Sequence, residues 1–460
     1  MEKVYVRLAK SYLHDLKLDE ATAAAEKVAT DHVRASLLAD INQLRDVKSS
    51  MRKHILDRLP RFRPGLSKTL KYWVVGHDDA QPIWDADVSK KKKLSALYCG
   101  IGDGRNFFTS IIHSFLAIQM GKPFPEAHYT LLDINAASLA RIILLFELAE
   151  EVAKALAANG RKTRTMKLLS TTMAYVYSGH IYPAWVHDRV QNALGKLIAK
   201  MEKNDKPIFE WLHVPKSTRG PILDCLRNWK GPAKNFHNTA EIRKAAVRIK
   251  HLTNMQMAFH PMAGLRQERT REDCDVDRHY FDNFGFVPPP EDVTPFIEPA
   301  IVPLLDAYDE GEQGAEEELA AYVDANWKVN VTLIDLEWEK VWQASEPYSV
   351  EGDVPSFINF DPLDILHCLS CSLPLDKDVS EEEENVMGLT GIFFEFVVYA
   401  LWTPRVRPKM TVEIVLGEMT DFMERLRYNC LEFRSDAAED GFDPRKFPRT
   451  YDRIHASNVT

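Results

Sequence analysis

The stretch LYCGIGDGRN, residues 97–106, decides the fold that this chain can adopt. It follows an apolar run, precedes a helix-like one, and places glycines at positions 100, 102 and 104. Glycine tolerates backbone angles that a side chain forbids. It also lets a ligand approach the free N–H groups where a helix begins. The pattern is typical of a nucleotide-binding turn between a strand and a helix.

A second strand and helix follow directly. The stretch HYTLLDIN (128–135) reads as a strand that ends on Asp133, and residues 136–160 read as a long helix. Strand, helix, strand, helix predicts a parallel sheet with right-handed crossovers, and therefore an α/β fold. An acidic residue at the end of the second strand can accept two hydrogen bonds from a ribose diol. The two turns together supply these candidate cofactor-binding residues: Gly100, Ile101, Gly102, Asp103, Gly104, Asp133, Ile134 and Asn135.

The glycine spacing discriminates between two cofactor classes. Dinucleotide-binding turns follow GxGxxG, and Arg105 stands where that pattern requires the last glycine. Asp103 would repel a pyrophosphate, whereas it is tolerable beside the positive charges of a sulfonium and an amino group. The turn therefore favours S-adenosylmethionine, or its product S-adenosylhomocysteine, over a dinucleotide.

Length and charge exclude several classes of protein. The chain has 460 residues, which corresponds to two or three domains of roughly 150 residues. Its net charge of -9 argues against broad binding to nucleic acid or to an anionic membrane. No apolar run reaches the roughly 18 residues of a membrane span, and residues 1–10 lack the apolar core of a secretory signal. Six scattered cysteines then read as reduced thiols of a cytoplasmic protein.

The rest of the chain divides by pattern into four parts. Residues 1–58 read as an N-terminal helical segment, because apolar residues recur every three or four positions. Residues 70–160 form the first part of the α/β core, with KYWVVG (71–76) as a further short strand. Residues 161–408 are mainly helical. Residues 409–460 return to strand, helix and strand.

Several motifs together carry a resemblance to a known family. They are SALYCGIGDGRNFF (95–108), YTLLDINAASLARIILLF (129–146), FDPLDILHC (360–368), VEIVLGEMTDF (412–422) and YDRIHASNV (451–459). With them the chain resembles a fungal family of uncharacterised proteins. The N-terminal domain of that family is shared with axonemal dynein assembly factors and accompanies MYND zinc fingers. The resemblance implies a class I methyltransferase-like core, although no MYND-type array of Cys and His is present here.

The resemblance also implies roles for the later motifs. VEIVLGEMTDF would be the third strand of the core, with Glu418 and Met419 near the adenine. YDRIHASNV would be the fourth strand, with Ser457 and Asn458 at its cofactor-facing end. Residues 161–408 would then be a large helical insertion over the carboxyl ends of the strands, where ligands bind in open α/β sheets.

Two departures from the pattern weaken the expectation of catalysis. Asp133 lies 29 positions after Gly104, whereas about 20 is usual. The sequence also stops soon after the fourth strand motif, before further strands of a complete sheet. Earlier segments such as 71–76 and 329–338 are one way to complete it. A second polypeptide or another copy of the chain is the other, since an open sheet edge is a pairing site.

Metal chemistry is not expected. The CxxC pair, Cys368 and Cys371, lacks a second pair at zinc-finger spacing. The alternating Asp273, Asp275 and Asp277 lack the glycine and distal glutamate of a calcium loop.

Two functions follow from the residues and the resemblance. The first is an S-adenosylmethionine-dependent methyltransferase that acts on a protein or a small metabolite. No catalytic residue is assigned, because methyl transfer depends mainly on alignment. The alternative is a non-catalytic scaffold or assembly factor with a degenerate methyltransferase fold. A third use of the same core stays open, since fold does not fix function.

Overall fold

The computed structural model describes most of the chain. The described residues are 2–58, 74–76, 80–85, 87–159, 164–203, 207–231, 238–247, 275–335, 360–363, 365, 369, 385–435 and 441–456. They form two compact units. Unit 1 is Met1–Gly65 with Thr420–Asp436, and unit 2 is Leu66–Met419 with Ala437–Thr460.

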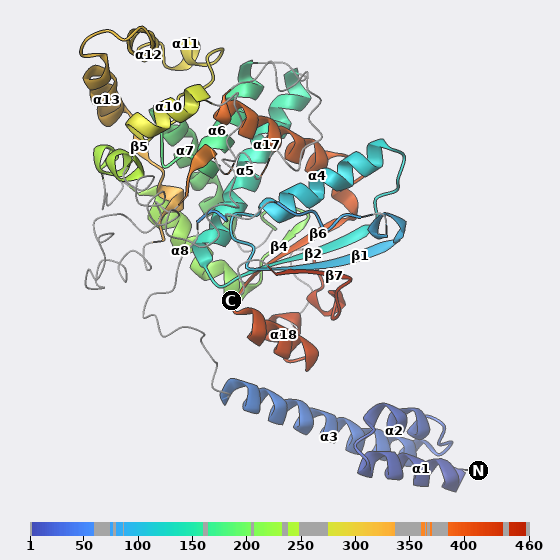
Figure 1. Ribbon diagram of the computed structural model, residues 1–460. Helices are drawn as coiled ribbons and strands as arrows, with labels where there is room; N and C mark the ends of the chain where they lie inside the picture. Colours follow the sequence, from blue (N-terminus) through green and yellow to red (C-terminus); the bar gives the residue numbers. More distant parts are fainter. Residues whose placement is uncertain are drawn as a thin grey trace, which may run out of the picture. The chain divides into compact units, whose positions relative to one another are not determined.

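Unit 2 is built around a parallel five-stranded sheet in the order β4-β6-β2-β1-β7 (Figure 1). Every neighbouring pair is parallel. The expected mixed α/β fold with a parallel sheet is thereby confirmed. The strands are β1 (Lys93–Cys99), β2 (Glu126–Asp133), β4 (Leu212–His213), β6 (Met410–Leu416) and β7 (Arg453–Ala456).

The strand order creates a switch point beside β1. From β1 the chain passes to β2 and later β6 on one side, and β7 then pairs with β1 on the other side. In open α/β sheets, ligands bind at the carboxyl ends of the strands at such a switch. The glycine turn directly follows β1, so the fold places it at this position.

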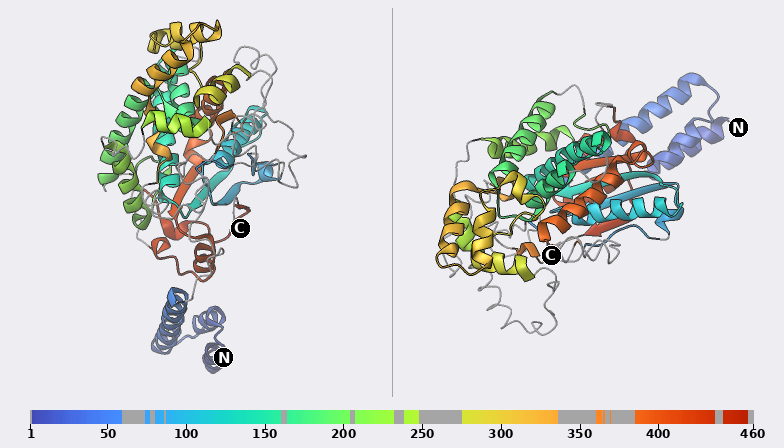
Figure 2. Two further views of the ribbon diagram at one scale, coloured as in Figure 1. Left: turned by 60° about the vertical axis from the view of Figure 1, so that its left-hand side comes forward. Right: turned by 90° about the horizontal axis from the view of Figure 1, so that it is seen from above.

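Helices cover one face of the sheet. They are α4 (Arg105–Gln119), α5 (Ala136–Asn159), α6 (Arg164–Ser178) and α17 (Val386–Trp402). The Phe107 ring of α4 packs edge-on against Tyr98 and Tyr129 of the sheet, with centroids 6.0 and 5.5 Å apart. Phe108 packs in the same manner on Phe394 of α17, and α4 and α17 lie side by side (Figures 1 and 2). Interlocked aromatic rings therefore join the sheet to its helical layer.

The opposite face of the sheet carries a buried polar cluster. Glu413 of β6 is fully buried, and its Oε2 accepts the Thr130 hydroxyl at 2.9 Å. The Thr130 hydroxyl also lies 2.9 Å from the Tyr451 hydroxyl. His128 Nε2 lies 3.4 Å from the same Glu413 oxygen, and its ring is tilted against that of Phe447 with centroids 4.6 Å apart. Residues of the segment 441–451 thus contact this face.

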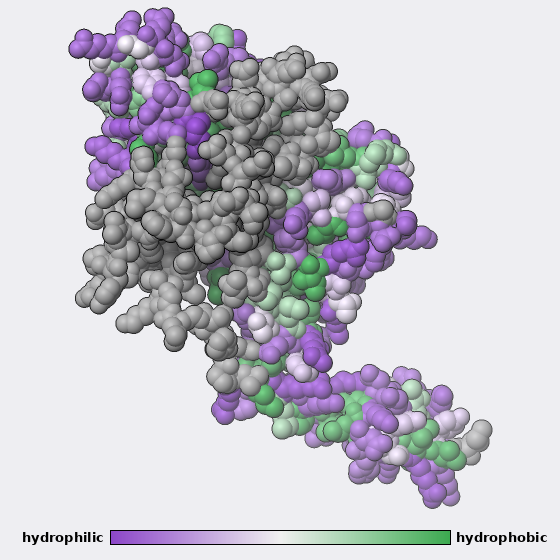
Figure 3. Space-filling model, in the orientation of Figure 1, coloured by the Kyte–Doolittle hydropathy of each residue, from purple (hydrophilic) through white to green (hydrophobic). Residues whose placement is uncertain are grey.

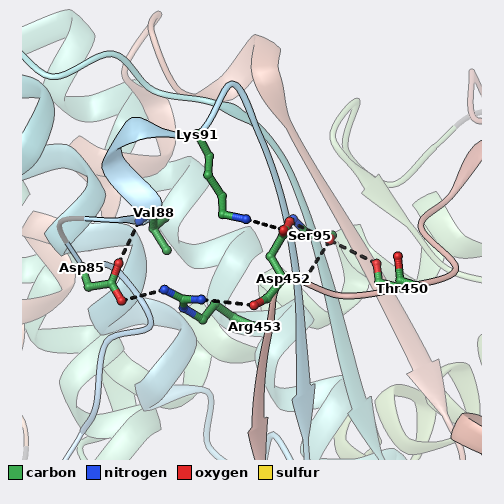
Figure 4. A network of polar contacts seen from close by, with 7 residues as sticks. All are labelled: Asp85, Val88, Lys91, Ser95, Thr450, Asp452 and Arg453. Atoms are coloured by element: carbon green, nitrogen blue, oxygen red, sulfur yellow. Dashed lines mark hydrogen bonds and ion pairs between the residues drawn. The ribbon is translucent and has the colours of Figure 1, made fainter.

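A network of side chains fixes β7 to β1 (Figure 4). Asp452 accepts the Ser95 N–H at 2.8 Å and the Lys91 ammonium at 2.5 Å. Arg453 donates to Asp85 at 2.8 Å, and Asp85 also accepts the N–H of Val88 at the start of η1 (Val88–Lys90). The network holds a four-residue strand at the edge of the described sheet.

The residues between β2 and β6 contain further elements besides helices. A two-stranded antiparallel sheet pairs β3 (Ile181–Tyr182) with β5 (Lys328–Val329). Besides α5, α6 and α17, this part of the chain contains the described helices α7 (Ala184–Glu202), α8 (Lys216–Lys230), α10 (Asp275–Phe284), α11 (Thr294–Ile297), α12 (Val302–Asp309) and α13 (Ala315–Asn326), with the short η4 (Val331–Leu333) and η5 (Arg407–Lys409). Following β6 in sequence, η7 (Pro444–Lys446) precedes β7.

Two expected strands of the main sheet are corrected. Residues 74–76 of the stretch 71–76 form a bend, while 71–73 lie outside the described residues. Residues 328–329 pair with β3, and the chain then turns into η4, where Asn330 accepts the N–H of Thr332. The fifth strand of the sheet is instead β4, two residues long, in a stretch that reads as a turn before a helix.

Unit 1 is helical. It contains α1 (Glu2–His14), α2 (Leu18–Ala25), α3 (Asp31–Arg58), most of α18 (Met419–Arg427) and η6 (Glu432–Arg434). Arg425 of α18 forms an ion pair with Asp57 of α3 at 2.8 Å. Among the described helices of the two units, none is both long and apolar enough to cross a membrane.

Candidate functional site at the carboxyl edge of the sheet

The glycine turn uses the left-handed backbone region three times. Gly100, Gly102 and Gly104 have φ angles of 66°, 54° and 83°. Side chains rarely tolerate these angles, so glycine is required at each position. The N–H of Ile101 donates to the Leu132 carbonyl at 3.1 Å, which extends the β1–β2 ladder into the turn.

Gly102 and Gly104 differ in the space around them. A Cβ added at Gly104 would lie 2.8 Å from the Phe108 ring, so this glycine permits close packing of α4. A Cβ added at Gly102 would have as its nearest neighbour the Gly100 carbonyl oxygen at 3.9 Å. The open side of Gly102 is therefore the part of the turn that a ligand can approach.

Asp133 connects the two turns at this edge. Its Oδ2 accepts the Gly102 N–H at 2.9 Å, and its Oδ1 accepts the Asn135 N–H at 2.8 Å. Burial raises the pKa of Asp133, and the backbone hydrogen bonds oppose that shift. Its carbonyl accepts the Gly417 N–H at 2.8 Å, so β6 is tied to the same point.

Asn135 begins α5 and reaches the large insertion. Its Oδ1 accepts the N–H groups of Ala137 and Ser138 at 2.7 and 3.1 Å, as an N-cap does. Its Nδ2 donates to Asp335 at 2.7 Å. Between Asp133 and Asn135, the Ile134 side chain is 66% exposed. The insertion therefore meets the carboxyl edge of β2 beside an exposed apolar side chain.

Asp103 and Arg105 are both buried within unit 2. Asp103 accepts the Gly76 N–H at 2.9 Å and the Arg105 N–H at 3.0 Å. A Cβ added at Gly76 would lie 2.1 Å from the Arg105 guanidinium. The segment 74–76 is consequently held against the turn, which sequence reasoning did not anticipate.

Arg141 is a further buried group that sequence reasoning missed. It is 3% exposed and donates to the carbonyl of Val74 at 3.0 Å, to that of Val176 at 3.1 Å, and to that of Tyr177. Burial, together with the charge of Asp103, raises the pKa of Tyr177 well above its usual value. A lone arginine inside the apolar run LARIILLF is the signal that could have marked this tie between the core and α6.

Of the candidate residues in the last part of the chain, the structure describes Glu418 and Met419. Glu418 is exposed just beyond β6, and Met419 beside it is partly buried. Burial raises the pKa of Cys99 to about 11, and the charge of Glu418 contributes. β6 and β1 lie on either side of β2, and all three strands end at the same edge of the parallel sheet. Ser457 and Asn458 lie outside the described residues.

The arrangement has free acceptor capacity and an open backbone. The Asp133 carboxylate accepts hydrogen bonds from the backbone N–H groups of Gly102, Asn135 and Ile134. A carboxylate has about four lone-pair sites, so it retains capacity for a ligand hydroxyl group. Gly102, with its open side, is hydrogen-bonded to this carboxylate, and the exposed Ile134 is the next residue in the chain. Among the described residues, no group of three or more His, Cys, Asp or Glu side chains could hold a metal ion. Of the three alternating aspartates, Asp273 lies outside the described residues, and Asp277 accepts the Val386 N–H at 2.5 Å.

Comparison with known protein families gives a match over part of the chain. Residues 74–173 match a family described as a domain of unknown function, DUF4470. The matched range contains the glycine turn, Asp133, Asn135 and Arg141, so the chain is similar to this family through the first part of the site. No curated protein and no solved structure matches the chain.

Proposed function

We propose that the carboxyl edge of this sheet binds S-adenosylmethionine and that the protein is a methyltransferase. The observation that carries the proposal is the open space beside Gly102, whose N–H donates a hydrogen bond to the buried carboxylate of Asp133. A nucleoside needs a close backbone approach and a ribose acceptor at neighbouring strand ends. Both features follow the first two strands of the sheet here.

The residues of the two turns divide the binding between them. Asp133 would accept the ribose hydroxyl groups with its remaining lone pairs. Ile134, which is 66% exposed, would pack against the base. When bound, the cofactor supplies an electrophilic methyl group, and the chain contributes alignment and exclusion of water. The insertion, tied to the edge through Asn135 and Asp335, would present the acceptor, either a protein or a small metabolite.

Calorimetric titration with S-adenosylhomocysteine tests the proposal. We expect binding that Gly102→Val weakens by more than about tenfold, because the added side chain fills the open space. Asp133→Ala should have a similar effect, since it removes the ribose acceptor. Gly121→Val is the matched control: Gly121 has a φ of 81°, open surroundings and a position at the far end of α4. Failure of the parent protein to bind at millimolar ligand would refute the proposal.

A second candidate function is a scaffold with a degenerate cofactor site. Asp133, Asp103 and Arg141 each form hydrogen bonds with backbone groups of this chain. In this alternative their role is structural, as the resemblance to assembly factors suggests. The partly exposed β7, with Ile454 at 52%, is the edge where a second polypeptide or another copy would pair. Light scattering on the purified chain, with and without Ile454→Lys, measures that association.

A further inference from the structure

A stripe of exposed apolar side chains runs along the second half of α3 in unit 1. Val47, Met51 and Ile55 are 47%, 61% and 54% exposed. Residues four apart share one face of a helix. We propose that this α3 stripe docks an amphipathic helix of another protein, one whose apolar face is flanked by acidic residues.

The stripe continues a face of α3 that already binds helices. In the first half of α3, Leu37 and Ile41 are buried in the small core shared with α1 and α2. Met51 and Ile55 follow these residues by two heptads, so they lie on the same face. α3 has 28 residues, whereas α1 has 13 and α2 has 8. The two short helices cover the first half of the face and leave the second half exposed.

Other faces of the second half of α3 contact α18 and the residues that follow it. Asp57 pairs with Arg425 at 2.8 Å, and Arg52 lies 5.4 Å from the ring centroid of Tyr428. Leu56 is 4% exposed. These contacts hold α18 and the residues after it away from the stripe. The second half of α3 is thus braced on its back, which keeps the stripe on a rigid element.

The charges beside the stripe select the partner. The charged side chains beside the stripe are of basic types: Lys48, His54 and Arg58. Arg52 lies further round the helix, where it contacts Tyr428. The acidic residues of this half, Asp46 and Asp57, lie away from it, and Asp57 is already paired. A second copy of α3 would bring like charges together, and the following residues 59–73 are also rich in Lys and Arg. Acidic flanks on the partner would satisfy these cations.

The narrow apolar surface of the α3 stripe favours a protein partner over a membrane. Figure 3 shows apolar side chains on these helices as small areas within a hydrophilic surface. The stripe contains three aliphatic side chains and lacks Trp and Phe, which membrane-surface helices carry on a broad apolar face. A single partner helix is a better match in width.

Fluorescence anisotropy with two synthetic peptides tests the inference on the full chain. Both peptides have about 20 residues and the same leucine stripe; one carries Glu on its flanks and the other carries Lys. We expect the Glu peptide to bind at least about tenfold more tightly than the Lys peptide. Met51→Glu should weaken the Glu peptide by a similar factor. Met120→Glu, at a methionine that is 74% exposed in unit 2, should leave it unchanged.

Several results would overturn the inference. Equal binding of the two peptides would refute the preference for acidic flanks. Unchanged binding of the Glu peptide to Met51→Glu would show that the peptide does not bind at the α3 stripe. Sedimentation of a dimer that Met51→Glu dissociates would assign the stripe to a second copy. Retention on anionic phosphatidylserine vesicles, lost in the same variant, would assign it to a membrane. Met51→Gln, which adds no charge, and circular dichroism check that a loss is not caused by unfolding.

Discussion

At the scale of single residues, Asp277 is a buried carboxylate with a pKa raised to about 7 by burial. It accepts the N–H of Val386 and the side-chain amide of Asn385 at the start of α17. The folded state therefore holds a proton that the unfolded state has already lost. The stabilising effect is complete below about pH 4 and is lost as the pH rises through about 7.

Asp277→Asn should remove that pH dependence. Between pH 5 and 8 the parent should lose about 2–3 kcal/mol of unfolding free energy at this residue, and the variant should not. Urea unfolding of both proteins across this range measures the difference. Asp224→Asn, at a side chain that is 72% exposed, controls for the loss of one charge. Parallel stability curves for the parent and Asp277→Asn would contradict the expectation.

A comparison of substitutions at two glycines can distinguish the cost of backbone strain from the cost of a steric clash. Gly104 and Gly121 have nearly equal φ angles of 83° and 81°. Gly121→Ala should cost about 1 kcal/mol, because the added Cβ meets open space. Gly104→Ala should cost roughly 1–3 kcal/mol more, since its Cβ would overlap Phe108. Chemical denaturation of the two variants measures both, and equal losses would show that Phe108 moves aside freely.

At the scale of elements, β7 depends on the contacts of Asp452, the residue that directly precedes the strand. Burial opposes ionisation of Asp452, but hydrogen bonds from Lys91 and Ser95 outweigh it and lower the pKa. The stabilisation is therefore present above the unfolded pKa near 4 and is lost as the pH falls through the lower folded value. Asp452→Ala should cost about 1–2 kcal/mol and speed amide exchange in β7. Asp87→Ala, which breaks an exposed ion pair with Lys90, should leave β7 exchange unchanged.

Most of the elements that the sequence predicted correctly share a strong local pattern. β1, β2 and β6 contain apolar runs bounded by turn residues, and α4 and α5 have long apolar faces. β7, with the sequence RIHA, has no such run, and its place in the core was implied by the resemblance. β4 was missed because two residues give no periodicity. Local patterns also say nothing about side-chain direction. Asp133 was expected to accept ribose hydroxyl groups, which stays a prediction, whereas its hydrogen bond from the Gly102 N–H could not be read from the sequence. The contacts of Arg141 join residues far apart in sequence, so only the folded chain reveals them.

At the scale of the whole molecule, the chain has two cores of very different composition. Half of the buried residues in the core cluster of unit 1 are alanine, and the larger ones include Leu37 and Ile41. Unit 2 contains a far larger core with many aromatic and branched side chains. Stabilisation by burial scales with apolar area, so unit 1 should unfold at the lower temperature.

Matched substitutions in the two cores test this separation. Ile41 and Ile143 are both fully buried, one in each unit. Ile41→Val should cost about 0.5–1.5 kcal/mol and lower the first calorimetric transition by several degrees, and leave the second in place. Ile143→Val should lower the second transition and leave the first in place. A single transition, or one that both variants shift together, would mean that the two cores unfold as one cooperative structure.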